Sequence, residues 1–202
     1  EQHVSGAGTS ALDGLAFGQA AVVVLLEPGI PFETFHLHHF QPTERRLVVT
    51  AEDRLPEAAE IVDRVLADVD RACSRFRPDS ELLTLVRDDE GWVTLSPLLT
   101  DLMAAALEAA QYSDGAVDPT IGGTLIDLGY DRDIESVRAR PAPGVRVIRR
   151  PAGWRSLRLE ARSDGQGRLW MPAGTQLDLG ATAKAVASDR CAAAVAEALG
   201  IG

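Results

Sequence analysis

The most regular pattern in this sequence is a helical one over residues 53–73. Apolar side chains recur there at three- and four-residue spacing and form one broad face, made by Ala58, Ile61, Val62, Val65, Leu66, Val69 and Cys73. Asp53 stands where a capping residue would, and Pro56 falls in the first turn, where a missing N–H costs nothing. We expect an amphipathic helix that begins near Asp53.

Three further segments have helical character. Residues 96–110 open with Ser-Pro and carry leucine, methionine and alanine along one side, which predicts a capped helix. Residues 180–199 are dominated by alanine and are followed by Gly200, a suitable C-cap. A single helical turn is expected within residues 80–86.

Short β-branched or apolar runs predict strands. They lie at residues 22–26, 32–40, 45–50, 92–95, around Val145, at 154–159 and at 169–171. A hairpin across residues 163–167 is expected to join the last two. Strands and helices do not alternate as βα units, so the expected fold class is α+β, with an antiparallel or mixed sheet and packed helices.

Two stretches lack a regular period. Residues 1–18 are rich in Gly, Ser and Ala and are expected to be a flexible N-terminal segment ahead of one domain over residues 19–202. Residues 112–130 are rich in Gly, Asp and Pro and are expected to form one long loop. Long ordered loops often carry function.

The composition excludes several classes of protein. Of the 202 residues, 20 are Lys or Arg and 30 are Asp or Glu, which gives a formal net charge of -10. Such a charge repels phosphate backbones, so nucleic-acid binding is not expected. The apolar run at residues 19–26 is much shorter than the roughly 20 residues that cross a bilayer, so no membrane span is expected. Cys73 and Cys191 are expected to be unpaired core thiols.

Two segments combine glycines with polar side chains in a way that suits ligand binding. Residues 113–123 bring two carboxylates and a hydroxyl together with three glycines, which let a ligand approach the backbone. Residues 177–185 place Asp178 just before a helix whose first turn holds Lys184, the single lysine of the chain, so an anion there would meet helix N–H groups and an ammonium. Each segment has a structural alternative: a surface turn for the first, and a turn-forming Asp178 with a solvated Lys184 for the second.

A histidine cluster is a weaker candidate. His36 and His38 would share one face of a strand, a spacing used for metal ligation. No matching group with ligand spacing stands elsewhere in the sequence, so surface histidines are the favoured interpretation.

Together with residues 74–82, Ser-Arg-Phe-Arg-Pro-Asp-Ser-Glu-Leu, the two glycine-containing segments resemble the signatures of the FAD:protein FMN transferases, the ApbE-type flavin transferases. Those signatures are S-x-F/Y-x-x-x-S-E-L, then D-G-x-x-D-P-T, then D-x-G-A-x-A-K, and all three occur here in order. The resemblance covers residues 45–199. It implies an ApbE-like fold and a magnesium-dependent enzyme that splits FAD, releases AMP and esterifies the FMN phosphate to a threonine of a target flavoprotein.

The resemblance also implies roles for individual residues. Phe76 would pack on the flavin, Ala116, Val117 and Asp118 would line its ring pocket, Asp178 and Lys184 would contact FAD, and the Ala181 carbonyl would ligate Mg2+. Magnesium prefers oxygen ligands, including substrate phosphates, so a backbone carbonyl suits it and the alanine side chain is sufficient.

The sequence departs from the family pattern in places. The Gly-Thr entry motif falls on residues 41–43 and keeps only Thr43, and Val86 stands where an asparagine is usual. The family's later Gly-Gly-Asp strand, histidine segment, acid and threonine are not in these 202 residues. We therefore expect residues 19–202 to be the N-terminal part of a flavin transferase domain that is inactive by itself. A non-catalytic flavin-binding remnant is the alternative.

The compartment stays open at this point. No export signal or lipobox stands in the chain, which favours the cytoplasm, whereas members of the family that it resembles often work outside it.

Overall fold

The fold is seen in a computed structural model that describes residues 33–40, 43–49, 51–130 and 152–200. It is α+β, as the sequence predicts, and its strands form two antiparallel sheets. The expected strands at residues 22–26 and around Val145, and the N-terminal segment 1–18, lie outside the described residues.

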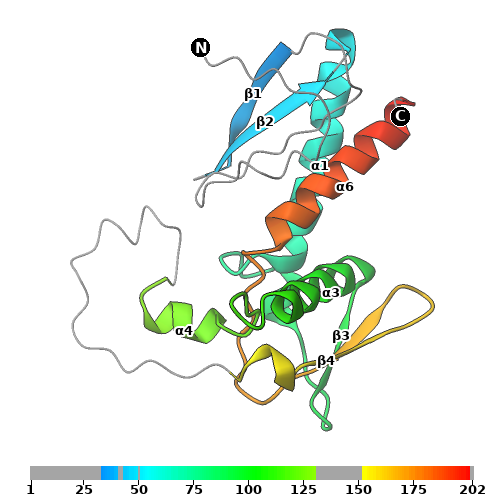
Figure 1. The fold of residues 1–202 in the computed structure, drawn as a ribbon. Helices are drawn as coiled ribbons and strands as arrows, with labels where there is room; N and C mark the ends of the chain where they lie inside the picture. Colours follow the sequence, from blue (N-terminus) through cyan, green and yellow to red (C-terminus); the bar gives the residue numbers. More distant parts are fainter. Residues whose placement is uncertain (1–32, 41–42, 50, 131–151, 201–202) are drawn as a thin grey trace.

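One end of the molecule is built on two long helices (Figure 1). Helix α1 (Leu55–Cys73) and helix α6 (Ala183–Leu199) lie side by side. A hairpin of β1 (Glu33–Phe40) and β2 (Thr43–Val49) packs against them through side chains of β2. Their shared core consists of Leu47, Val49, Ala58, Ile61, Val62, Cys191 and Val195. Burial of these apolar side chains is the main stabilising term for an alanine-rich helix such as α6, whose propensity alone is marginal.

The other end is a small sheet packed on a helix. Strands β3 (Trp92–Leu95), β5 (Gly167–Trp170) and β4 (Arg158–Ala161) pair in that order, and all neighbours are antiparallel. Helix α3 (Pro97–Tyr112) covers the sheet and buries Leu99, Leu102 and Met103. Leu66 of α1 packs against the cores at both ends, so the two ends are continuous.

Several expected elements are confirmed. Ser96 caps α3, with its hydroxyl accepting from the Leu99 N–H, and Gly200 ends α6 in the left-handed region at φ 63. The 163–167 hairpin joins β4 and β5, and α2 (Glu81–Thr84) is the expected single turn. Cys191 is fully buried and its thiol donates to the Val62 carbonyl at 4.0 Å, whereas Cys73 is half-buried.

Four expected boundaries are wrong. Asp53 does not cap α1: it lies inside the short 3-10 helix η1 (Glu52–Arg54), and Arg54 is the capping position, with no side-chain bond. Residues 154–156 form a second 3-10 turn, η2 (Trp154–Ser156), in place of a strand, because Ser156 donates a 2.7 Å hydrogen bond back to the Gly153 carbonyl.

The other two corrections concern the glycine-containing segments. Residues 112–130 are not one long loop, since α4 (Gly122–Asp127) lies inside them. This helix begins with two glycines, and glycine has a low helix propensity, so the sequence does not predict it. Helix α6 begins at Ala183 and not at Gly180, because the Leu179 carbonyl accepts from the Thr182 and Ala183 amides in a preceding turn.

Candidate functional site

The first motif is held together by its serine and its glutamate. Ser80 is fully buried, and its hydroxyl donates a 2.7 Å hydrogen bond to the Ser74 carbonyl. Glu81 accepts hydrogen bonds from the amide and the hydroxyl of Ser96, at 2.7 and 2.6 Å. These bonds fix the turn after α1 against the start of α3. Phe76, in the same turn, is left 52% exposed.

The second motif is organised by Asp118. One carboxylate oxygen accepts from the Thr120 amide at 2.8 Å and the Thr120 hydroxyl at 2.7 Å, and the other accepts from the Trp154 amide at 3.2 Å. Thr120 is buried and accepts in turn from the Gly153 amide. Asp118 therefore binds the loop to η2, while Ala116 is exposed and Val117 half-buried beside it.

The second and third motifs are joined through their backbones. The Asp178 amide donates to the Pro119 carbonyl at 2.8 Å, and the Gly122 amide donates to the Gln176 carbonyl at 3.1 Å. Gly122 is required by this approach, because a Cβ at that position would lie 2.7 Å from the Gln176 carbonyl oxygen and 2.8 Å from that of Leu177.

The Asp178 carboxylate connects the third motif to the first. Its Oδ2 accepts a 2.6 Å hydrogen bond from Arg75 Nε, and its Oδ1 accepts from the Gly180 amide at 2.8 Å. Both members of the Arg75–Asp178 ion pair are largely buried, at 10% and 13% side-chain exposure. The three motifs, distant in sequence, therefore meet at one place.

The start of α6 lies at the edge of this junction. Lys184 is exposed and forms no ion pair with a described residue. The Lys184 and Ala185 amides donate to no backbone carbonyl of the described residues, so they point out of the positive end of the helix. Ala181 is exposed just before the helix.

Cys73 is close to the junction but unsuited to nucleophilic chemistry. Burial raises the pKa of its thiol to about 12, and the negative charges of Asp70 and Asp178 act in the same direction. Since the thiolate is the reactive form, Cys73 stays an inert thiol at neutral pH. On the outer side of the same turn, a hydrogen bond from Arg77 lowers the pKa of Asp79.

The described residues do not by themselves make a magnesium site. Among them, no three His, Cys, Asp or Glu side chains gather as a metal would require. Asp118 and Asp178, the carboxylates of the motifs, are committed to hydrogen bonds within the protein. The Ala181 carbonyl is the single oxygen that the resemblance assigns to the metal here, and near-octahedral magnesium needs more.

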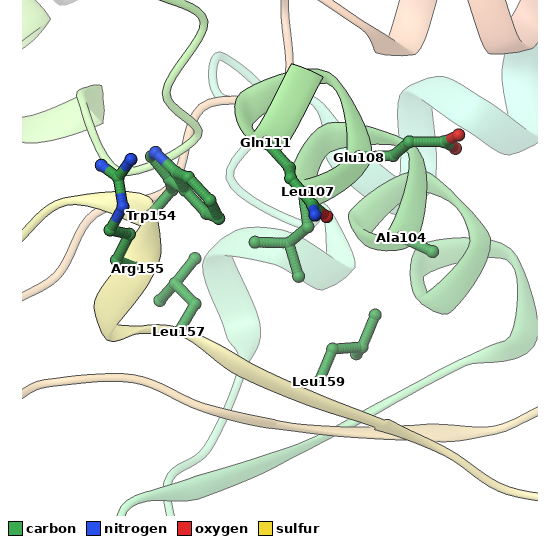
Figure 2. A pocket seen from close by; sticks show the side chains of 8 residues that line it. All are labelled: Ala104, Leu107, Glu108, Gln111, Trp154, Arg155, Leu157 and Leu159. Atoms are coloured by element: carbon green, nitrogen blue, oxygen red, sulfur yellow. The ribbon is translucent and has the colours of Figure 1, made fainter. Parts of the chain in front are cut away.

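A separate groove of about 550 Å3 runs between α3 and the segment from η2 to β4. Figure 2 shows its lining side chains, which are Ala104, Leu107, Glu108, Gln111, Trp154, Arg155, Leu157 and Leu159. None of the predicted site residues lines it. Two lining residues connect the groove to the 113–123 loop: the Trp154 amide donates to Asp118, and Arg155 forms an ion pair with Asp114.

A model of the ApbE family matches residues 40–201. The chain belongs to the ApbE family. No curated protein matches this chain.

The ApbE assignment is matched by solved structures. The ApbE protein of Thermotoga maritima is similar with a TM-score of 0.58, 21% identity, and 83% of this chain covered. The flavin transferase ApbE of Vibrio cholerae is similar with a TM-score of 0.62, 21% identity and 85% covered. The aligned parts are 53% and 55% of those proteins, so this chain spans about half their length. At this identity the likeness establishes the fold.

Two residues of this ApbE chain were not singled out by sequence reasoning. Arg75 occupies the variable position of the S-x-F motif, so no pattern marks it, yet it forms the central ion pair. Trp154 was placed in a strand, whereas its amide closes the 113–123 loop. Both act through partners distant in sequence, which local patterns do not reveal.

Among the described helices, none is long and apolar enough to cross a membrane.

Proposed function

We propose that this chain is the flavin-binding part of a flavin transferase. That enzyme would cleave FAD, attach FMN through a phosphoester to a threonine of an acceptor flavoprotein, and release AMP. The observation that carries the proposal is the convergence of the three motifs at the Arg75–Asp178 pair, next to an exposed aromatic ring. Family membership supports the same conclusion.

In this proposal the described residues bind and orient the substrate. The exposed ring of Phe76 offers a stacking surface for the isoalloxazine ring. Ala116, Val117 and Asp118 would line the pocket of that ring. Lys184 and the free amides at the start of α6 would hold a phosphate, since a helix N-terminus and an ammonium both favour an anion.

The chemical step is a phosphoryl transfer. The threonine oxygen of the acceptor attacks the FMN phosphorus, the bond to the bridging oxygen breaks, AMP leaves with that oxygen, and the hydroxyl proton is released. Such reactions depend mainly on positioning and on stabilising charge. Magnesium is part of the proposed activity, and Ala181 would offer it one carbonyl. The described residues do not complete the site for this ion.

A non-catalytic flavin-binding protein is the second candidate. This candidate is favoured because the carboxylates of Asp118 and Asp178 both accept hydrogen bonds from within the protein. Neither carboxylate is therefore free to act as a general base.

The test uses the protein in the longest form that its gene encodes. FAD binding is measured by flavin fluorescence, with NAD and ATP as competitors. The protein is then incubated with FAD, MgCl2 and a threonine-containing acceptor, and covalent FMN and free AMP are measured by mass spectrometry. An acceptor with that threonine replaced by alanine is the control. Preferential FAD binding with acceptor labelling supports a transferase, FAD binding without labelling or AMP supports the second candidate, and tighter NAD or ATP binding contradicts both.

A further inference from the structure

Arg75 contacts three segments close to the proposed flavin site: the third motif at Asp178, the chain after α4 at Tyr130, and its own turn at Phe76. Its Nε donates to Asp178, an Nη donates to the Tyr130 carbonyl after α4, and its guanidinium carbon lies 4.5 Å from the centroid of the Phe76 ring. The side chain is only 10% exposed. A guanidinium is planar and carries a fork of donors, so one arginine can pair, donate and stack at once.

The Asp178 carboxylate is held in a single orientation by these contacts. Arg75 occupies Oδ2 and the Gly180 amide occupies Oδ1, while the Asp178 backbone is fixed to Pro119. A largely buried carboxylate without its cation would be poorly compensated. Removing Arg75 is therefore expected to disturb Asp178 and the loop to which it is attached.

The Phe76 ring is oriented by the same guanidinium. Arg75 covers one face of the ring through a cation–π contact, and the side chain is still 52% exposed. The face opposite Arg75 is therefore the one that a planar ligand can use. An aromatic side chain in an exposed turn would otherwise sample several rotamers.

We propose that Arg75 is a positioning residue for flavin. It fixes the Phe76 ring so that one defined face receives the isoalloxazine ring, and it holds the Asp178 carboxylate in one orientation. This inference rests on the proposed flavin-binding function. It assigns Arg75 no contact with the reacting atoms.

The test compares four single variants, and the double variant that combines Arg75→Met with Phe76→Leu, with the wild-type protein in its longest natural form. Arg75→Met removes the charge but keeps an unbranched side chain, Arg75→Lys keeps the charge without the planar fork, and Phe76→Leu removes the ring. Arg71→Gln is the matched control, because Arg71 also lies at the end of α1 but pairs with Asp68 on the exposed surface. FAD affinity, the visible circular dichroism of bound flavin and thermal unfolding are measured for each.

Arg75→Met is expected to weaken FAD binding about tenfold or more and to change the visible circular dichroism of the bound flavin. The FAD affinity of Arg75→Lys is expected to lie between those of Arg75→Met and the wild-type protein. The control is expected to stay within about twofold. In the Phe76→Leu background, Arg75→Met is expected to cost less affinity, because part of its effect acts through the ring.

Two results would overturn the inference while leaving flavin binding intact. One is a folded Arg75→Met protein with wild-type affinity and dichroism; the other is an unchanged Arg75→Met effect in the Phe76→Leu background. If Arg75→Met does not fold, Arg75→Lys decides by the same dichroism. A wild-type protein that does not bind FAD contradicts the proposed function and this inference with it.

Discussion

The Asp178 amide donates a 2.8 Å hydrogen bond to the Pro119 carbonyl, and this bond joins two of the three family motifs directly. A parallel bridge between Ile121 and Gln176 extends the contact by one further step. The two segments pack backbone against backbone because no side chain separates them at Gly122.

Gly122→Ala is expected to destabilise this junction. The new Cβ would meet two backbone carbonyls, which cannot move aside as a flexible side chain would, and overpacking of this kind costs about 1–3 kcal/mol. Gly123→Ala is the matched control, since its Cβ would meet only the flexible end of the Gln176 side chain at 3.2 Å. Chemical denaturation measures both variants, and equal stabilities would contradict the role of the close approach.

Lys184→Ala is expected to weaken FAD binding without affecting folding. Loss of a charged hydrogen bond to a phosphate corresponds to about 1.5–3 kcal/mol, a decrease in affinity of roughly tenfold or more. Because Lys184 is exposed and unpaired among the described residues, the stability should change by less than about 0.5 kcal/mol. Arg190→Gln, further along α6 and paired with Asp101, is the control for the loss of a positive charge. An unchanged flavin affinity would leave Lys184 as a solvated surface charge.

Ser80→Ala is expected to lower the free energy of unfolding by about 1–3 kcal/mol, because the part-buried Ser74 carbonyl and the Leu83 amide would lose the fully buried Ser80 hydroxyl as a partner. Ser188→Ala on α6 provides the comparison, since Ser188 makes no side-chain hydrogen bond to a described residue and alanine favours helix. Urea denaturation separates the two. A Ser80→Ala protein as stable as the control would show that the motif serine is not structural.

Cys73 is expected to react slowly with thiol reagents in the folded protein. With its pKa raised to about 12, the thiolate fraction at pH 8 is roughly a thousandfold below that of a free cysteine, whose pKa is about 8.5. Alkylation followed by peptide mapping, native against unfolded, measures the difference. Fast labelling of Cys73 in the native protein would be the contrary result.

The same shift predicts a direction for alkaline stability. The unfolded thiol ionises above about pH 8.5, whereas the folded one keeps its proton to about pH 12. The contribution to stability is therefore constant at lower pH and is lost as the pH rises through this window. Cys73→Ala should make the alkaline decline shallower.

Sequence reasoning predicted the elements with strong local signals. The apolar period of α1, the Ser-Pro start of α3 and the left-handed Gly200 are each encoded within a few residues, and each is confirmed. The element boundaries that were predicted wrongly depend on contacts with residues distant in the sequence. Helix α4 begins at two glycines because residue 122 must approach Gln176, a contact that no local pattern contains.

The site was predicted less completely than the fold. The motifs identify Phe76, Asp118 and Asp178, but not how their side chains are used. Asp118 and Asp178 both hold the protein together, by bonds to Trp154 and Arg75. These bonds cross long sequence separations, so a single sequence cannot reveal them. The roles of Phe76, Ala116, Val117, Asp118, Asp178, Ala181 and Lys184 towards a ligand stay predictions.

The pairing of α1 with α6 has a consequence for synthesis on the ribosome. The apolar face of α1 is translated early, but Cys191 and Val195, which cover it, come from the last described helix. Until α6 has left the exit tunnel, Ala58, Ile61 and Val62 lack that cover. The nascent chain therefore presents a hydrophobic stripe while the residues between α1 and α6 are translated, and such a stripe is a surface that chaperones bind.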